Sequence, residues 1–123
     1  MSLLNDVREK ISDTARAAVK ASRELAEISR LNAAVKSEEE KIKTLLQDIG
    51  LAVFETYRDN KPVMVDLELK CKEIMECRQN IVELKERILD VKNLVACPNC
   101  KASVERVFVY CPECGTQLES SEQ

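Results

Sequence analysis

The sequence has no histidine, no tryptophan and only two glycines, and aromatic residues make up 3% of it. Without histidine, the commonest general acid and base of enzymes is missing. With two glycines, no glycine-rich loop can hold a phosphate. The shortage of aromatic side chains removes the bulky groups that usually fill a compact core. These absences argue against an enzyme, so we expect no catalytic and no cofactor-binding residues.

Long apolar runs are also missing. No stretch approaches the roughly 20 apolar residues of a membrane span. The start, MSLLNDVREKISD, brings in charge at Asp6 and Arg8, so no apolar export segment forms there. We therefore expect a cytoplasmic protein whose thiols stay reduced. The net charge of -3 provides no overall basic field, so nucleic acid is not an expected partner.

Charged residues are plentiful, at 33% of the chain, and apolar residues recur among them at a helical period. Counting from Leu4 as heptad position a gives these a and d residues: Leu4, Val7, Ile11, Thr14, Ala18, Ala21, Leu25, Ile28, Asn32, Val35, Glu39, Ile42, Leu46, Ile49 and Val53. A 3.5-residue period kept this long is typical of a coiled-coil seam. It predicts one helix over about residues 3–58, with weak points at Ser37, where a capping box begins, and at Gly50.

The run Asp59-Asn60-Lys61-Pro62 interrupts the pattern and predicts a turn at about 59–62. A second helix is predicted over about residues 63–95, with Pro62 at its start. Its seam residues are Leu67, Lys70, Ile74, Cys77, Ile81, Leu84, Ile88, Val91 and Val95. Because the connection is short, residues 1–95 should form an antiparallel helical hairpin, or stalk.

The first helix is predicted to be much longer than the second, so everything before Leu25 should overhang. Because an isolated apolar helix face is poorly stable in water, something should cover it. A second copy of the chain is the favoured cover, and Asn32 at an a position fits a device that sets oligomer state. A membrane surface is the second candidate, because residues 7–23 carry a local charge of +3. The cysteine-rich C-terminal segment is the third.

Four of the six cysteines form two C-P-x-C pairs near the end of the chain: Cys97, Cys100, Cys111 and Cys114. This spacing is typical of a closed zinc site with four thiolate ligands, so we expect one structural Zn2+. Two disulfides are the alternative, which a reducing compartment disfavours. Pro98 and Pro112 should stiffen the two bends, and Gly115 can supply a positive φ. We place this module at residues 96–118, followed by a disordered tail at 119–123.

The residues between the pairs, 103–110, are β-rich and predict a small hairpin. The remaining cysteines, Cys71 and Cys77, fall at e and d of the second helix. They lie roughly 120° apart around its axis, so they cannot easily share a metal. Cys77 is interpreted as a small core residue. The expected fold is therefore mainly α: a long antiparallel helical hairpin, in effect a coiled coil, with a small C-terminal β zinc module.

Three stretches, EISRLNAAVKSEEEKIKTLLQDIG, ELKERILDVKNLVACPNC and YCPECGTQL, resemble a family of short bacterial zinc-ribbon domain-containing proteins of the Firmicutes type. The resemblance implies a zinc ribbon on a helical stalk, with Cys97, Cys100, Cys111 and Cys114 as ligands, and it implies no activity. The chain departs from the family at Lys101, where glycine is usual.

The predicted function is a non-enzymatic interaction or scaffold protein, whose stalk oligomerises or docks while the ribbon presents a surface to a protein partner. One alternative is a transcription-machinery factor that binds RNA polymerase, since such factors combine a helical hairpin with acidic residues at its tip. Here the tip offers Glu55 and Asp59, flanked by Arg58 and Lys61. Another alternative is an adaptor held at a membrane surface by the N-terminal helix. The sequence does not name the protein partner.

Overall fold

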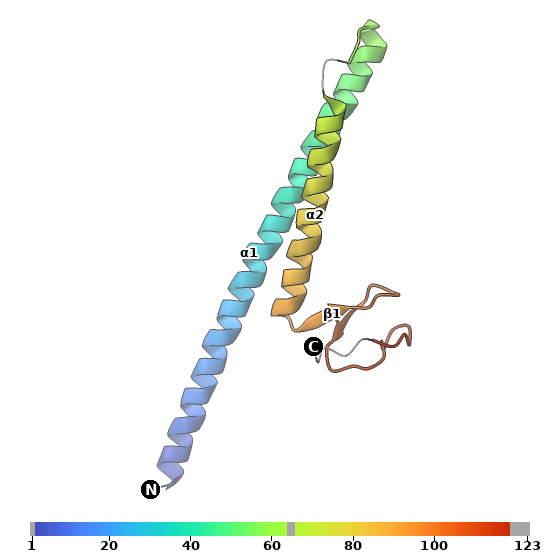
Figure 1. Cartoon of the computed structure of the whole chain (residues 1–123). Helices are drawn as coiled ribbons and strands as arrows, with labels where there is room; N and C mark the ends of the chain where they lie inside the picture. Colours follow the sequence, from blue (N-terminus) through green and yellow to red (C-terminus); the bar gives the residue numbers. More distant parts are fainter. Residues whose placement is uncertain (1, 64–65, 119–123) are drawn as a thin grey trace. The chain divides into compact units, whose positions relative to one another are not determined.

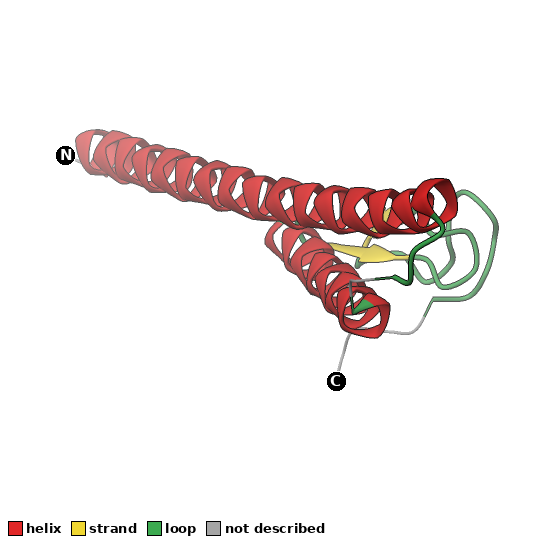
Figure 2. Cartoon of the chain, turned by 90° about the horizontal axis from the view of Figure 1, so that it is seen from above, coloured by secondary structure: helices red, strands yellow, loops and turns green. Residues whose placement is uncertain are grey.

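The computed structural model describes residues 2–63 and 66–118 and contains four elements (Figure 1). They are the helices α1 (Ser2–Asp59) and α2 (Leu67–Val91) and the strands β1 (Leu94–Ala96) and β2 (Ser103–Glu105). Figure 2 shows that helix makes up most of the chain, which confirms the predicted mainly α fold. The chain divides into two units, residues 31–88 and the residues before and after them.

Helix α1 runs through 58 residues without a break. At 1.5 Å per residue it is about 87 Å long. Neither Ser37 nor Gly50 interrupts it, so the prediction of one helix over about residues 3–58 is confirmed. The helix ends where Asn60 takes a left-handed conformation with φ of 54°, which asparagine tolerates better than most residues.

The predicted start of the second helix at about residue 63 is wrong. Residue 63 and Asp66 are not helical, and residues 64–65 lie outside the described residues. Helix α2 begins at Leu67 instead. The Asp66 carboxylate accepts a hydrogen bond of 3.0 Å from the Leu69 backbone N–H, which is the geometry of an N-cap. The acidic side chain at Asp66, rather than the ring of Pro62, therefore opens the helix.

The predicted end at residue 95 is also wrong, because α2 stops at Val91. Asn93 has φ of 57°, and its N–H donates to the Asp90 carbonyl at 3.0 Å, which closes the last turn. The chain then enters β1 at Leu94, two residues before the predicted start of the ribbon. Val95, placed on the helical seam by its heptad position, is thus a strand residue.

In the unit of residues 31–88 the two helices pack against each other in antiparallel directions (Figures 1 and 2). The seam predicted for α2 is confirmed, since its members from Leu67 to Ile88 are all buried or half-buried. Polar contacts cross the interface at two levels. The Asn80 amide donates to the Glu38 carboxylate at 3.3 Å, and the Lys70 ammonium lies 3.4 Å from the Asp48 carboxylate.

The seam predicted for α1 is only half right. Its d residues, such as Val35, Ile42 and Ile49, are buried or half-buried as expected. Its a residues are not: Leu25, Leu46 and Val53 are 68%, 55% and 50% exposed, and Asn32 and Glu39 are exposed too. The residues that face α2 instead are those one position before each of these a residues: Leu31, Glu38, Leu45 and Ala52.

The physical reason is that α1 carries two overlapping apolar rows. One row contains Leu31, Leu45 and Ala52, and the adjacent row contains Leu25, Leu46 and Val53. Either row could form a packing face together with the d residues. Packing against α2 selects the first row, and Leu31 becomes completely buried, with no exposed surface. Asn32 is therefore outside the seam within one chain.

Every side chain from Ser2 to Arg23 is exposed, which agrees with the expectation that this part of α1 overhangs. The exposed residues include Leu3, Leu4, Val7, Ile11 and Val19, each at least 50% accessible. Within the part of the chain that the structure describes, neither helix combines the length and apolar character of a membrane-spanning segment.

Candidate metal centre

The C-terminal module is built on the antiparallel pairing of β1 and β2, in which Leu94 faces Glu105, Val95 faces Val104 and Ala96 faces Ser103. The predicted hairpin between the two cysteine pairs is wrong. The hairpin instead encloses the first pair, because the turn that carries Cys97 and Cys100 also connects the strands. Around the second pair, Tyr110 and Gln117 form a single bridge in the same sense.

The two cysteine pairs lie in turns with the same hydrogen bonds. In the first, Cys97 N–H donates to the Ala102 carbonyl at 2.8 Å and Lys101 N–H to the Cys97 carbonyl at 3.0 Å. In the second, Cys111 N–H donates to the Thr116 carbonyl and Gly115 N–H to the Cys111 carbonyl, both at 2.8 Å. We call these two turns the first and second knuckles. Each needs a left-handed residue directly after its second cysteine.

Gly115 provides that conformation in the second knuckle with φ of 79°, as its sequence position suggested. In the first knuckle Lys101 adopts it with φ of 66°. The departure from glycine therefore leaves the turn geometry intact, although a residue with a Cβ is strained in this region.

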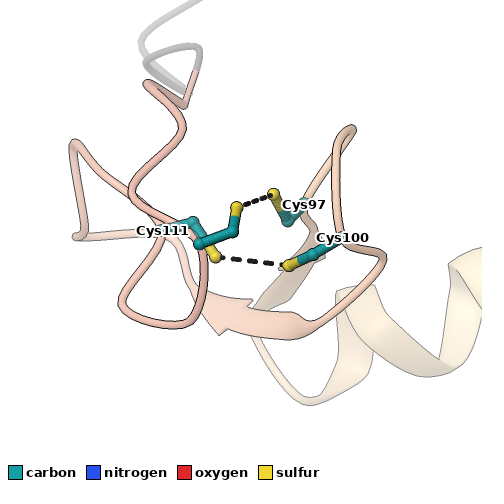
Figure 3. A group of neighbouring side chains, drawn as sticks. Cys97, Cys100 and Cys111 are labelled. Atoms are coloured by element: carbon teal, nitrogen blue, oxygen red, sulfur yellow. Dashed lines mark hydrogen bonds between the residues drawn. The ribbon is translucent and has the colours of Figure 1, made fainter.

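The knuckles bring all four predicted sulfurs into one cluster, with every pair within 4.8 Å (Figure 3). Cys97 Sγ lies 3.6 Å from Cys114 Sγ, and Cys100 Sγ lies 3.6 Å from Cys111 Sγ. Each of these two contacts joins a cysteine of the first knuckle to a cysteine of the second. Cys97 and Cys111 are buried and form the small core of the module with Val104 and Leu118.

Hydrogen-bond donors surround the sulfurs. The backbone N–H of Cys100, followed by that of Asn99, stabilises the Cys97 thiolate and lowers its pKa. The Thr116 hydroxyl, 3.2 Å from the Cys114 sulfur, together with the Asn99 side chain and the Thr116 N–H, lowers the pKa of Cys114 to about 5. Asn99 and Thr116 are contributors that the cysteine spacing alone did not reveal.

Cys100 behaves in the opposite way. The Ala102 N–H stabilises its thiolate, but burial and the neighbouring sulfurs of Cys111, Cys114 and Cys97 outweigh that donor and raise the pKa to about 12. Crowded thiols resist full ionisation because each new negative charge repels the others. A cation at the centre removes this conflict, since it stabilises all the thiolates at once.

The arrangement fits a tetrahedral metal ion. With Zn–S bonds of about 2.3 Å, the sulfurs of a four-thiolate site lie about 3.8 Å apart. The two contacts of 3.6 Å already match this separation, and the widest sulfur pair needs to close by only about 1 Å. The four cysteines are therefore positioned to coordinate one metal ion, with one sulfur available for each corner of the tetrahedron.

Among the described residues, no other group of histidine, cysteine or acidic side chains is gathered in this way. Cys71 is exposed on α2, while Cys77 is buried in the helix seam, as its d position predicts. Burial, and then a hydrogen bond to Glu38, raise the pKa of Cys77, so its thiol stays protonated at neutral pH.

The acidic tip that an RNA polymerase factor would need is partly neutralised. Both carboxylate oxygens of Asp59 accept hydrogen bonds of 2.9 Å from the guanidinium of the adjacent Arg58. The same pair lowers the pKa of Asp59. This contact weakens the case for a free carboxylate at the tip.

Comparison with protein-family models, with curated proteins and with solved structures found no match for this chain. The resemblance to bacterial zinc-ribbon proteins thus has no support from them. What the structure shares with that expectation is a helical N-terminal region, a small C-terminal sheet and a cluster of four cysteines.

Proposed function

We propose that the chain is a zinc-binding protein without enzymatic activity, whose stalk and ribbon present surfaces to protein partners. The zinc is structural and one ion is bound per chain, held by Cys97, Cys100, Cys111 and Cys114. The observation that supports it is the cluster of four sulfurs, which offers one ligand for each tetrahedral position and would leave none open for water or substrate.

The metal would supply most of the folding energy of the ribbon. Among the described residues, the buried core of this module contains four members, and two of them, Cys97 and Cys111, are proposed ligands. Structural zinc in small modules contributes about 10–16 kcal/mol at neutral pH, far more than so small a core provides.

Zinc binding is tested by metal analysis of the purified chain. The wild type should contain one zinc, and Cys100→Ser should lose it together with the dispersed ribbon resonances of Val104. Cys71→Ser is the matched control, because Cys71 is exposed and distant in sequence from the knuckles, and it should retain the metal. A metal-free wild type with its four clustered cysteines oxidised would contradict the proposal.

The interaction role rests on where the aromatic side chains lie. All four are exposed: Phe54 at 55%, Tyr57 at 87%, Phe108 at 44% and Tyr110 at 59%. Aromatic residues normally fill cores, and on surfaces they are enriched in the central contacts of protein interfaces. Each aromatic pair has exposed apolar residues close to it in sequence. These are Leu51 and Val53 near Phe54 and Tyr57, and Val107 and Val109 near Phe108 and Tyr110.

Two double variants separate these surfaces. Phe54→Ser with Tyr57→Ser alters the tip of the stalk, and Phe108→Ser with Tyr110→Ser alters the ribbon. Affinity capture from the native host with zinc-loaded protein should lose its specific partner with one variant and keep it with the other. Equal capture by both variants and by the wild type would argue against either aromatic surface as the docking site.

Self-association through the N-terminal part of α1 belongs to the same proposal. The exposure of every side chain from Ser2 to Arg23, apolar ones included, supports this segment as the interface. The alternatives predict different results. A polymerase factor would co-purify with RNA polymerase, and a membrane adaptor would float with anionic vesicles through its basic, apolar N-terminal helix.

A further inference from the structure

We propose that the N-terminal part of α1 pairs with the same part of a second copy in an antiparallel coiled coil centred on Arg16. This deepens, and rests on, the proposed self-association. The contact surface, which we call the N-terminal face, consists of Leu4, Val7, Ile11, Thr14, Ala18, Ala21 and Leu25, all exposed. Side chains of this face and its neighbours Lys10 and Ala15 line a shallow groove along the helix.

The N-terminal face follows heptad positions a and d, and an antiparallel partner sets each a residue near a d residue. With the centre at Arg16, Val7 lies opposite Leu25 of the second copy, and Leu4 lies opposite its Ile28, which is already half-buried in its own chain. Ile11 lies opposite Ala21, and Thr14 opposite Ala18. Large side chains thus meet at both ends, and small ones allow close approach in the middle.

Charge decides this register. Lys10 and Glu24 both occupy g positions, which flank the seam, and in an antiparallel pair g faces g. In the proposed register Lys10 faces Glu24 of the second copy, and the two-fold symmetry makes the contact twice. Both side chains are accessible. Within its own helix Glu24 pairs with Lys20 at 3.9 Å, an exposed contact of little strength.

Other arrangements do not give this complementarity. A shift of one heptad sets Lys10 opposite Ala17 or Leu31. A shift of two sets Lys10 opposite itself or opposite Glu38. In the latter case Glu24 faces Glu24, and Glu38 is already bonded to Lys41 and Asn80. In a parallel pair Lys10 would face Ala15, and Glu24 would be about 21 Å away along the axis. The antiparallel register centred on Arg16 is therefore the one among these that joins Lys10 to Glu24 without setting like charges opposite each other.

The test is charge exchange, read by sedimentation equilibrium of the zinc-loaded chain at low salt. Lys10→Glu and Glu24→Lys should each weaken dimerisation about tenfold, because two attractive contacts become repulsive. A one-to-one mixture of these two variants should recover dimerisation, since every contact between them is again attractive. The double variant, Lys10→Glu with Glu24→Lys, should recover it as well.

Controls carry the same charge changes on the outer side of the helix. Arg16→Glu matches Lys10→Glu, and Glu9→Lys matches Glu24→Lys, since positions 9 and 16 face away from the seam. Both should dimerise as the wild type does, with unchanged helical circular dichroism. Raising the salt should reduce the difference between the variants and the wild type.

The outcomes separate the two claims. A wild-type dimer that is insensitive to the exchanges, or is not recovered in the mixture, overturns the antiparallel register and leaves self-association standing. A wild type that is monomeric at micromolar concentration overturns both. Flotation of that monomer with vesicles of anionic lipid would then assign the N-terminal face to a membrane surface.

Discussion

Lys101 in the first knuckle occupies the same place as Gly115 in the second. Each directly follows the second cysteine of its pair, donates its N–H to the carbonyl of the first, and has a positive φ, of 66° and 79° respectively. A side chain in this region costs about 1–2 kcal/mol, which glycine avoids at some loss of chain entropy.

Lys101→Gly should therefore stabilise the ribbon by about 1 kcal/mol, and Gly115→Ala should destabilise it by about as much. Among the described residues other than its two chain neighbours, no heavy atom lies within 4 Å of the Cβ that alanine would add at Gly115, so the cost comes from the backbone. Competition with a zinc chelator measures both effects. Lys101→Ala is the control, because it keeps the Cβ, and a gain in that variant would show that the lysine side chain is responsible.

Because α2 packs on the row of Leu31 rather than on the row of Leu46, alanine substitutions at these two leucines should differ widely in their cost to stability. Leu31→Ala should destabilise the stalk by about 2–5 kcal/mol, because Leu31 has no exposed surface. Leu46→Ala, at 55% exposure, should cost much less. Urea unfolding followed by helical circular dichroism measures both. Equal losses would mean that the row of Leu25 and Leu46 shares the packing.

Glu38 should make the stalk sensitive to acid. Its half-buried carboxylate accepts hydrogen bonds from Lys41 at 3.1 Å, from the Cys77 thiol and from Asn80, and these lower its pKa from 4.5. A carboxyl group with a lowered folded-state pKa stabilises the fold above its unfolded value. That contribution is lost as the pH falls through the folded pKa, so it should disappear below about pH 4.5.

The variant Glu38→Gln should flatten the dependence of stalk stability on pH in this range, as measured by urea unfolding at pH values between about 6 and 3. Glu39→Gln, on the neighbouring exposed residue, should leave the slope unchanged. If the two variants follow the same slope, the cross-helix contacts of Glu38 do not depend on its charge.

Removal of the metal should unfold the ribbon and spare the stalk. A strong chelator should abolish the pairing of β1 with β2, because Cys97 and Cys111 form half of the buried core. The signal at 222 nm should change little, since the helices account for most of it. Amide exchange at Val104 gives the local readout, and protection that persists after zinc release would show that the ribbon folds without metal.

The sequence alone determined the features that depend on local chemistry. A helix of 58 residues follows from an uninterrupted apolar period. The α2 seam follows from an apolar row whose a and d residues from Leu67 to Ile88 are all buried or half-buried, while Met75 and Val82 beside it stay exposed. The four clustered cysteines were predicted because two residues three apart in a tight turn have few ways to point.

The tertiary structure decided what local chemistry left equivalent. Two adjacent apolar rows on α1 differ little in hydrophobicity, and only contact with α2 buries Leu31 while leaving Leu46 exposed. Val95 suits a helix seam or a strand equally well, and its pairing with Val104 makes it a strand residue. Lys101 has no intrinsic preference for a left-handed turn, and it adopts one because the knuckle that brings the sulfurs together requires it.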